Sequence, residues 1–159
     1  MPSYQNLAVE LAAQAPAFRL RINGTSMTPL LRHGDSVILE PVTPASLHRG
    51  DIIAFRLGQE TITHRIIALE PQKILTLGDN LLQNDPLLLP DAILGRVLVL
   101  EQGGRQYQIS RGIWPFLHRS LAWWGWQMTA PHRPKWVYRT FRVGFWLARH
   151  VAKIFLYLS

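Results

Sequence analysis

Short runs of apolar residues follow one another over residues 18–110, and most runs end at Gly, Pro, Asn or Asp. Within residues 61–69 the side chains alternate, so that His64 falls on one face of an extended segment and Arg65 on the other. Gln102-Gly103-Gly104 has the composition of a hairpin turn. Short strands that end at such turn-forming residues predict a mainly β domain. The predicted strands are 18–22, 36–40, 51–55, 61–69, 74–77, 93–100 and 106–110.

Helical spacing replaces this alternation towards both ends of the chain. Residues 113–128 and 135–158 are rich in Trp, Leu and Phe, and Pro131 and Pro134 separate them into two predicted helices. Residues 1–17 carry apolar side chains at helical spacing and predict a short amphipathic helix. The chain is therefore divided into an N-terminal helix (1–17), a β-rich domain (18–111) and a helical C-terminal extension (112–159).

Charge changes at the start of the C-terminal extension. Residues 1–101 hold 8 Lys/Arg and 10 Asp/Glu, whereas residues 102–159 hold the other 9 Lys/Arg and no acid, so the net charge of +7 combines about −2 with +9. All six tryptophans also lie in the basic part. Basic, Trp-rich amphipathic helices suit a membrane interface, so we expect residues 113–158 to associate with a membrane surface, either peripherally or by weak insertion of this segment. The cations form one helical stripe of Lys135, Arg139, Arg142, Arg149 and Lys153.

The alternative is that both helices pack on the β domain with a solvated basic face, in a cytoplasmic protein. A membrane-spanning role is not expected for residues 135–159, because the stripe cations would be costly in hydrocarbon. Nucleic acid is not an expected partner, since no recognition motif accompanies the basic residues. The absence of Cys excludes disulfides and thiolate chemistry, and we expect no metal or cofactor.

Ser26 is the first candidate for chemistry, because it lies in a loop bounded by Gly24 and Pro29. Such a turn can present a hydroxyl together with backbone N–H groups, the donors that an oxyanion hole needs. An isolated serine of this kind is more often a turn residue that bonds its own backbone. A serine hydroxyl is also a weak nucleophile without a neighbouring base, so partners decide the question.

His64 is the best candidate for a base, because it lies inside an apolar strand where its imidazole needs hydrogen-bond partners. A half-buried structural histidine is the alternative reading. Asp85 precedes Pro86, so its backbone is biased to an extended form from which the side chain can project to orient the histidine. Asp79 is the competing acid, although an aspartate in a Gly-Asp-Asn turn more naturally bonds local amides.

Five ordered blocks of the sequence resemble the type I signal peptidases, over roughly residues 18–100. The resemblance is closest to the archaeal and endoplasmic-reticulum branch, which has histidine in place of the bacterial lysine, because His64 falls in the general-base block. The family usually carries a membrane-spanning helix before the serine, which residues 1–17 do not resemble. The blocks are Ser26-Met27-Thr28-Pro29, Arg49 to Phe55, His64-Arg65-Ile66-Ile67, Leu77-Gly78-Asp79-Asn80 with Asp85, and Gly95-Arg96-Val97.

The resemblance implies a mainly β peptidase domain and a serine endopeptidase that removes a signal or leader peptide from an exported or modified precursor. It assigns Ser26 as nucleophile, His64 as general base and Asp85 as the acid, with Asp79 beside them. The Ser26 amide, with a second amide near Gly24 or Thr25, is expected to bind the oxyanion. Met27 is expected to contact the peptide.

Two other functions are compatible with these residues. Self-cleaving repressor-type peptidases share the Ser-Met-x-Pro turn and the fold, but they use a lysine base and cut an Ala-Gly or Cys-Gly bond. Neither dipeptide occurs here, and no lysine falls in the base block. The second is a catalytically silent membrane-surface or peptide-binding protein that retains the fold.

Overall fold

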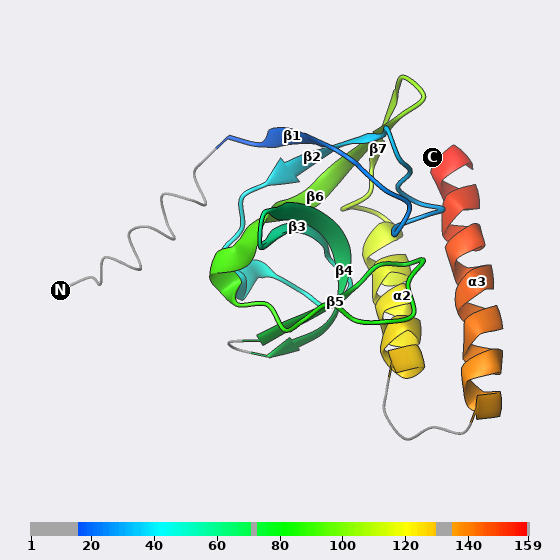
Figure 1. Cartoon of the computed structure of the whole chain (residues 1–159). Helices are drawn as coiled ribbons and strands as arrows, with labels where there is room; N and C mark the ends of the chain where they lie inside the picture. The colour runs from blue at the N-terminus through cyan, green and yellow to red at the C-terminus, as the bar shows by residue number, and fades with distance from the viewer. Residues whose placement is uncertain (1–15, 71–72, 130–134, 159) are drawn as a thin grey trace.

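A computed structural model describes residues 16–70, 73–129 and 135–158 (Figure 1). The N-terminal helix predicted over residues 1–17 lies almost entirely outside the described residues. The elements, with η for a short 3₁₀ helix, are β1 Phe18–Arg21, β2 Ser36–Glu40, η1 Pro44–Ser46, β3 Ile52–Leu57, β4 Glu60–Glu70, β5 Lys73–Leu77, η2 Pro90–Ala92, β6 Ile93–Gln102, β7 Arg105–Gln108, α2 Trp114–Thr129 and α3 Lys135–Leu158.

The strands form one antiparallel sheet in the order β1-β2-β6-β3-β4-β5, and β7 pairs with β6. The predicted hairpin is present, because Gln102 pairs with Arg105 across Gly103 and Gly104. Both glycines have positive φ, 59° and 78°, as a two-residue hairpin turn requires. The prediction of a mainly β protein with a helical C-terminal part is confirmed.

Both faces of β4 carry buried side chains. Ile66 packs into a cluster with Phe55 and Leu88, whereas Ile67 packs into the larger core that also holds residues of α2. The pleat sends successive side chains to opposite faces, so neighbouring residues of one strand reach different cores. A register shift between Ile66 and Ala68 interrupts the strict alternation predicted for residues 61–69.

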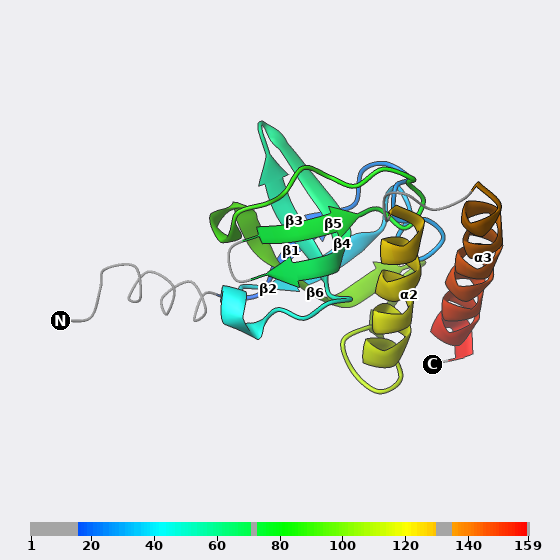
Figure 2. The ribbon, with the colours of Figure 1, turned by 90° about the horizontal axis from the view of Figure 1, so that it is seen from below.

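The two helices stand beside the sheet, with α2 between the sheet and α3 (Figures 1 and 2). A Cβ at Gly125 of α2 would lie 3.1 Å from Leu77 and 3.2 Å from Ile67, so this glycine lets the helix approach the sheet closely. A Cβ at Gly144 of α3 would lie 2.6 Å from the Trp124 ring. Close approach at these glycines holds the three layers together.

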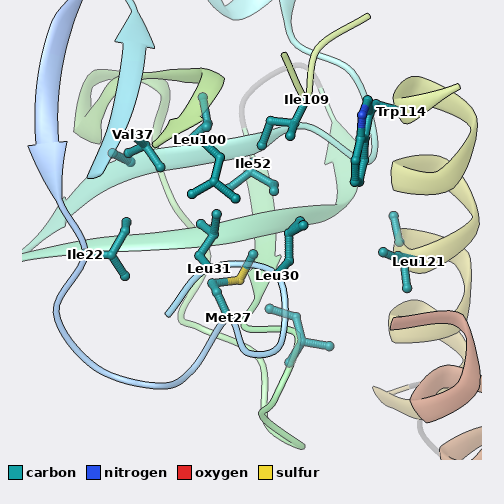
Figure 3. Close-up of a cluster of buried hydrophobic side chains, with 14 of the residues drawn as sticks. Ile22, Met27, Leu30, Leu31, Val37, Ile52, Leu100, Ile109, Trp114 and Leu121 are labelled. Atoms are coloured by element: carbon teal, nitrogen blue, oxygen red, sulfur yellow. The ribbon is translucent and has the colours of Figure 1, made fainter. Parts of the chain in front are cut away.

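The helices contribute to the main hydrophobic core. Trp114 and Leu121 of α2 and Phe145 of α3 belong to the same buried cluster as residues of the sheet. Figure 3 shows Trp114 and Leu121 facing the side chains that follow β1, Met27 and Leu30. In the part of the chain that the structure describes, no helix combines the length and the apolar character needed to cross a membrane.

Candidate active site

Ser26, His64 and Asp85 lie in one hydrogen-bonded row, although they come from three separate segments. His64 is in β4, Ser26 is in the turn after β1, and Asp85 is in the loop between β5 and η2. His64 Nε2 lies 2.9 Å from Ser26 Oγ, and His64 Nδ1 lies 2.7 Å from Asp85 Oδ2. The structure therefore brings together the three residues that the sequence singled out.

The chemistry of the partners decides which ring nitrogen of His64 carries the proton. An ionised carboxylate only accepts hydrogen bonds, so Nδ1 donates to Asp85. Nε2 is then free to accept the hydrogen bond that the Ser26 hydroxyl donates. This is the tautomer in which an imidazole can take a proton from a serine.

Thr76 holds Asp85 in place, a role that was not predicted from the sequence. The Thr76 hydroxyl donates to Asp85 Oδ2 at 2.6 Å, and the Asp85 amide donates to the Thr76 carbonyl at 3.0 Å. Thr76 is fully buried in β5 between Leu75 and Leu77. A hydroxyl inside an apolar strand was the available signal, since a buried polar group needs a partner.

Gly78 leaves the space in which the serine and histidine meet. A Cβ at this position would lie 2.9 Å from His64 Nε2 and 2.9 Å from the Ser26 carbonyl oxygen. The neighbouring Asn80 amide donates to that same carbonyl at 2.7 Å, which ties the two loops together. Any larger residue at position 78 would have to displace one of them.

Asp79 has a different partner from the one its turn suggested. Its carboxylate accepts two hydrogen bonds from Arg65, at 2.8 and 2.7 Å, and both side chains are buried. Arg65 follows His64 along β4 and so projects from the opposite face. The interpretation of Asp79 as an acid that bonds its own turn was therefore wrong, because a buried guanidinium is the stronger partner.

His118 of α2 completes the environment of Arg65 and was also missed. Arg65 donates to His118 Nδ1 at 2.6 Å and to the Gly50 carbonyl at 3.1 Å. His118 Nε2 lies 2.8 Å from the Ile109 carbonyl, which can only accept, so the ring is neutral with its proton on Nε2. Burial, followed by the charge of Arg65, lowers the pKa of His118 to about 3. Arg65 is thereby held by two loops and by α2.

Arg149 of α3 reaches the same loops from the other side. Its guanidinium donates to the carbonyl oxygens of Asp79 and of Thr28, the latter at 3.3 Å, and to Asn80 Oδ1 at 3.2 Å. Arg149 was predicted as one of five cations in a helical stripe, and its side chain binds the loops that flank Ser26.

The amides near Ser26 differ in their availability. The Gly24 amide donates to His33 Nδ1 at 3.2 Å, so it already has an acceptor. In residues 16–70, 73–129 and 135–158, no hydrogen bond uses the amide of Thr25 or of Ser26 as its donor. The amides of Thr25 and Ser26 therefore remain available to bind an added oxygen.

A cleft of about 570 Å³ opens beside Ser26 and His64. One wall is the end of β1 and the turn that follows it, and the other is residues 60–64 of β4. Along residues 60–64, β4 pairs with β3, and its pairing with β5 begins only at Arg65. β1 pairs only with β2 among the described strands. Both walls therefore present strand edges whose backbone groups pair with no further strand among the described residues.

Met27 lines this cleft but is mainly a core residue. It is 2% exposed and belongs to the main hydrophobic cluster. Its sulfur accepts a hydrogen bond from the Asp79 amide at 3.4 Å. No group of three or more His, Asp or Glu side chains among the described residues is arranged to hold a metal ion.

The comparison with known families assigns this sheet and its serine turn to a class of protease-type hydrolases. A family model described as Peptidase S24-like matches residues 3–98, which is more than half of the chain. The chain belongs to this family. Ser26, His64 and Asp85 lie inside the matched segment, and α2 and α3 lie outside it. No curated protein matched the chain.

Proposed function

We propose that this protein is a serine endopeptidase in which Ser26 is the nucleophile, His64 the general base and Asp85 the orienting acid. The observation that carries the proposal is the row of two hydrogen bonds, Ser26 Oγ to His64 Nε2 and His64 Nδ1 to Asp85 Oδ2. A serine needs a base in hydrogen-bond contact to become nucleophilic, and the base needs a third group to orient it.

The proposed reaction is acyl transfer to Ser26. The Ser26 proton moves to His64 Nε2 while Oγ bonds to the peptide carbonyl carbon. His64 then gives this proton to the departing amine as the C–N bond breaks, which leaves an acyl ester on Ser26. Water, deprotonated by His64, attacks the ester and releases the acid and the serine. The free amides of Ser26 and Thr25 are suited to binding the oxyanion that forms in both steps.

We propose an extended peptide as the substrate, bound in the cleft between β1 and residues 60–64 of β4. Free strand edges bind an extended chain by adding it to the sheet through main-chain hydrogen bonds. The sequence resemblance described above extends this to a signal or leader peptide on a precursor. Asp79 is proposed to have a structural part, through Arg65.

Self-cleavage is the second candidate, because repressor-type peptidases share this fold. It is disfavoured by the base, which is a histidine here, and by the absence of an Ala-Gly or Cys-Gly bond from the chain. A silent peptide-binding protein is disfavoured by the complete hydrogen-bonded row. Both alternatives give distinct results in the experiment below.

Ser26→Ala is expected to reduce peptide cleavage at least about 10³-fold, because the nucleophile is lost and only binding and oxyanion contacts remain. The assay uses a pool of synthetic signal and leader peptides with mass-spectrometric detection of the products. Ser46→Ala in η1 is the matched control, because the Ser46 hydroxyl donates to the nearby Thr43 carbonyl and lies outside the residues that line the cleft.

Equal cleavage by wild type and Ser26→Ala would refute the assignment. A wild-type protein that binds peptides from the pool and cleaves none would point to the silent alternative. Incubation without peptide covers the remaining case, since loss of intact mass in wild type but not in Ser26→Ala would indicate self-cleavage.

Gly78→Ala is expected to slow cleavage by about 10²-fold or more, because its methyl group would displace His64 Nε2 or the Ser26 carbonyl by a large part of an ångström. The Gly58→Ala control adds its methyl in open space and carries only the strain of a φ of +61°. Rates are compared at saturating peptide. Cleavage by Gly78→Ala at the Gly58→Ala rate would mean that the close contact is unimportant.

A further inference from the structure

α3 carries a stripe of exposed apolar side chains on its outer face. Positions 143, 147, 151 and 154 follow one another at intervals of four, four and three, and position 146 lies three after 143, which places the stripe on one side of the helix. Their exposed fractions run from 43% to 60%. The opposite side of α3, with Phe145 and Gly144, packs inward against the core and Trp124 of α2. The outer stripe consists of Val143, Trp146, Leu147, Val151 and Ile154.

Cations lie beside this stripe, and α3 itself contains no acid, although Val143 and Trp146 also line a cleft that reaches the loop at Asp79. Arg142 is exposed and Lys153 is partly exposed, whereas Arg149 is turned towards the loops near Ser26. Residues 102–159 contain no Asp or Glu at all. An apolar helix face with a tryptophan and a basic flank is the arrangement of helices that lie in the surface of a lipid bilayer.

The charge of α3 and its surroundings favours a lipid bilayer over a second copy of the chain as the binding partner of the stripe. A dimer through α3 would bring together two segments that each carry a net charge of about +9, with no acid in either to pair with the other. Anionic lipid headgroups supply the missing negative charge, and the acyl region below them receives the apolar side chains.

We propose that the outer face of α3 binds the surface of an anionic lipid bilayer, with the helix lying in the interface. The contact is made by the apolar stripe and its flanking cations, and Arg149 takes no part in it. Because Arg149 contacts the loops beside Ser26 from the inner side of the same helix, those loops would lie roughly 10–12 Å from the bilayer surface, the diameter of a helix.

The test measures sedimentation of the full-length protein with vesicles of phosphatidylcholine alone and of phosphatidylcholine mixed with phosphatidylglycerol. Wild type is expected to bind the mixed vesicles at least about ten-fold more strongly, and less strongly as salt is raised. The variant Leu147→Glu/Ile154→Glu places two acids in the stripe and is expected to lose at least about ten-fold in binding.

The matched control is Leu87→Glu/Leu89→Glu, which adds two acids at exposed leucines of the loop before η2. It has the same net charge as the stripe variant and should bind nearly as wild type does. Both variants are expected to fold, because all four substituted side chains are exposed, and thermal unfolding checks this.

Failure of wild type to bind the mixed vesicles, or equal losses in the two double variants, would overturn the proposal. A wild-type dimer in sedimentation equilibrium that only the stripe variant dissociates would assign the face to a second copy and would overturn it as well. Vesicle binding needs no peptide cleavage, so this result is independent of the proposed peptidase activity.

Discussion

Asp85→Asn should lower kcat for peptide cleavage by roughly 10³- to 10⁴-fold while the protein remains folded. The variant removes the negative charge that stabilises the imidazolium formed when His64 takes the serine proton. An amide can also present its NH₂ group to Nδ1, which would move the ring proton to Nε2 and leave no acceptor for Ser26. The control is Asp91→Asn, an exposed acid in the first turn of η2.

The comparison that decides the role of Asp85 is with Asp79→Asn, measured by the same assay. If Asp79→Asn loses the larger share of kcat in protein that is still folded, the orienting acid is Asp79 and the row through Asp85 has no catalytic importance. Thermal unfolding is recorded for each variant, so that a rate lost by unfolding is not counted as chemistry.

Asp79→Asn itself should cost about 3–5 kcal/mol of unfolding free energy, because it leaves the Arg65 guanidinium buried without its counter-charge. The remaining partners of Arg65, His118 and the Gly50 carbonyl, are neutral and cannot replace a carboxylate. Urea denaturation measures the change. An exposed pair provides the comparison, since breaking Arg19–Glu101 with Arg19→Ala should cost at most about 1 kcal/mol.

A loss for Asp79→Asn no greater than that for Arg19→Ala would mean that the buried pair adds nothing. The double variant Arg65→Met/Asp79→Leu offers a further check, because it removes both charges together. Replacing a buried pair by apolar side chains is often neutral, so the double variant should recover part of the stability that Asp79→Asn loses.

Local patterns were sufficient for much of the fold. The run 36–40 is β2 as predicted, and the Gly103-Gly104 turn joins β6 to β7. These features depend on neighbours in sequence, namely side-chain alternation and the positive φ that glycine allows. The row of Ser26, His64 and Asp85 could also be proposed, because a resemblance over five blocks supplied the long-range pairing that spacing alone lacks.

Other features of the site depend on partners far away in the chain. Asp79 pairs with Arg65 because the fold buries both side chains. The local turn pattern predicted that Asp79 bonds amides of its own turn, and it contains no information about this distant arginine. His118 is determined by Arg65 and the Ile109 carbonyl together. Arg149 contacts Thr28 across 121 positions of sequence, and no periodicity within α3 contains that information.

The position of α2 has a consequence for where this protein can be cut. The family match ends at residue 98, within β6, before the residues that pair with β7 and before α2. A fragment ending there would leave Ile67 and Leu77 without the helix that Gly125 brings against them, and His118 could no longer bind Arg65. The segment that matches the family is thus shorter than the packed unit, because α2 and α3 share one hydrophobic core with the sheet.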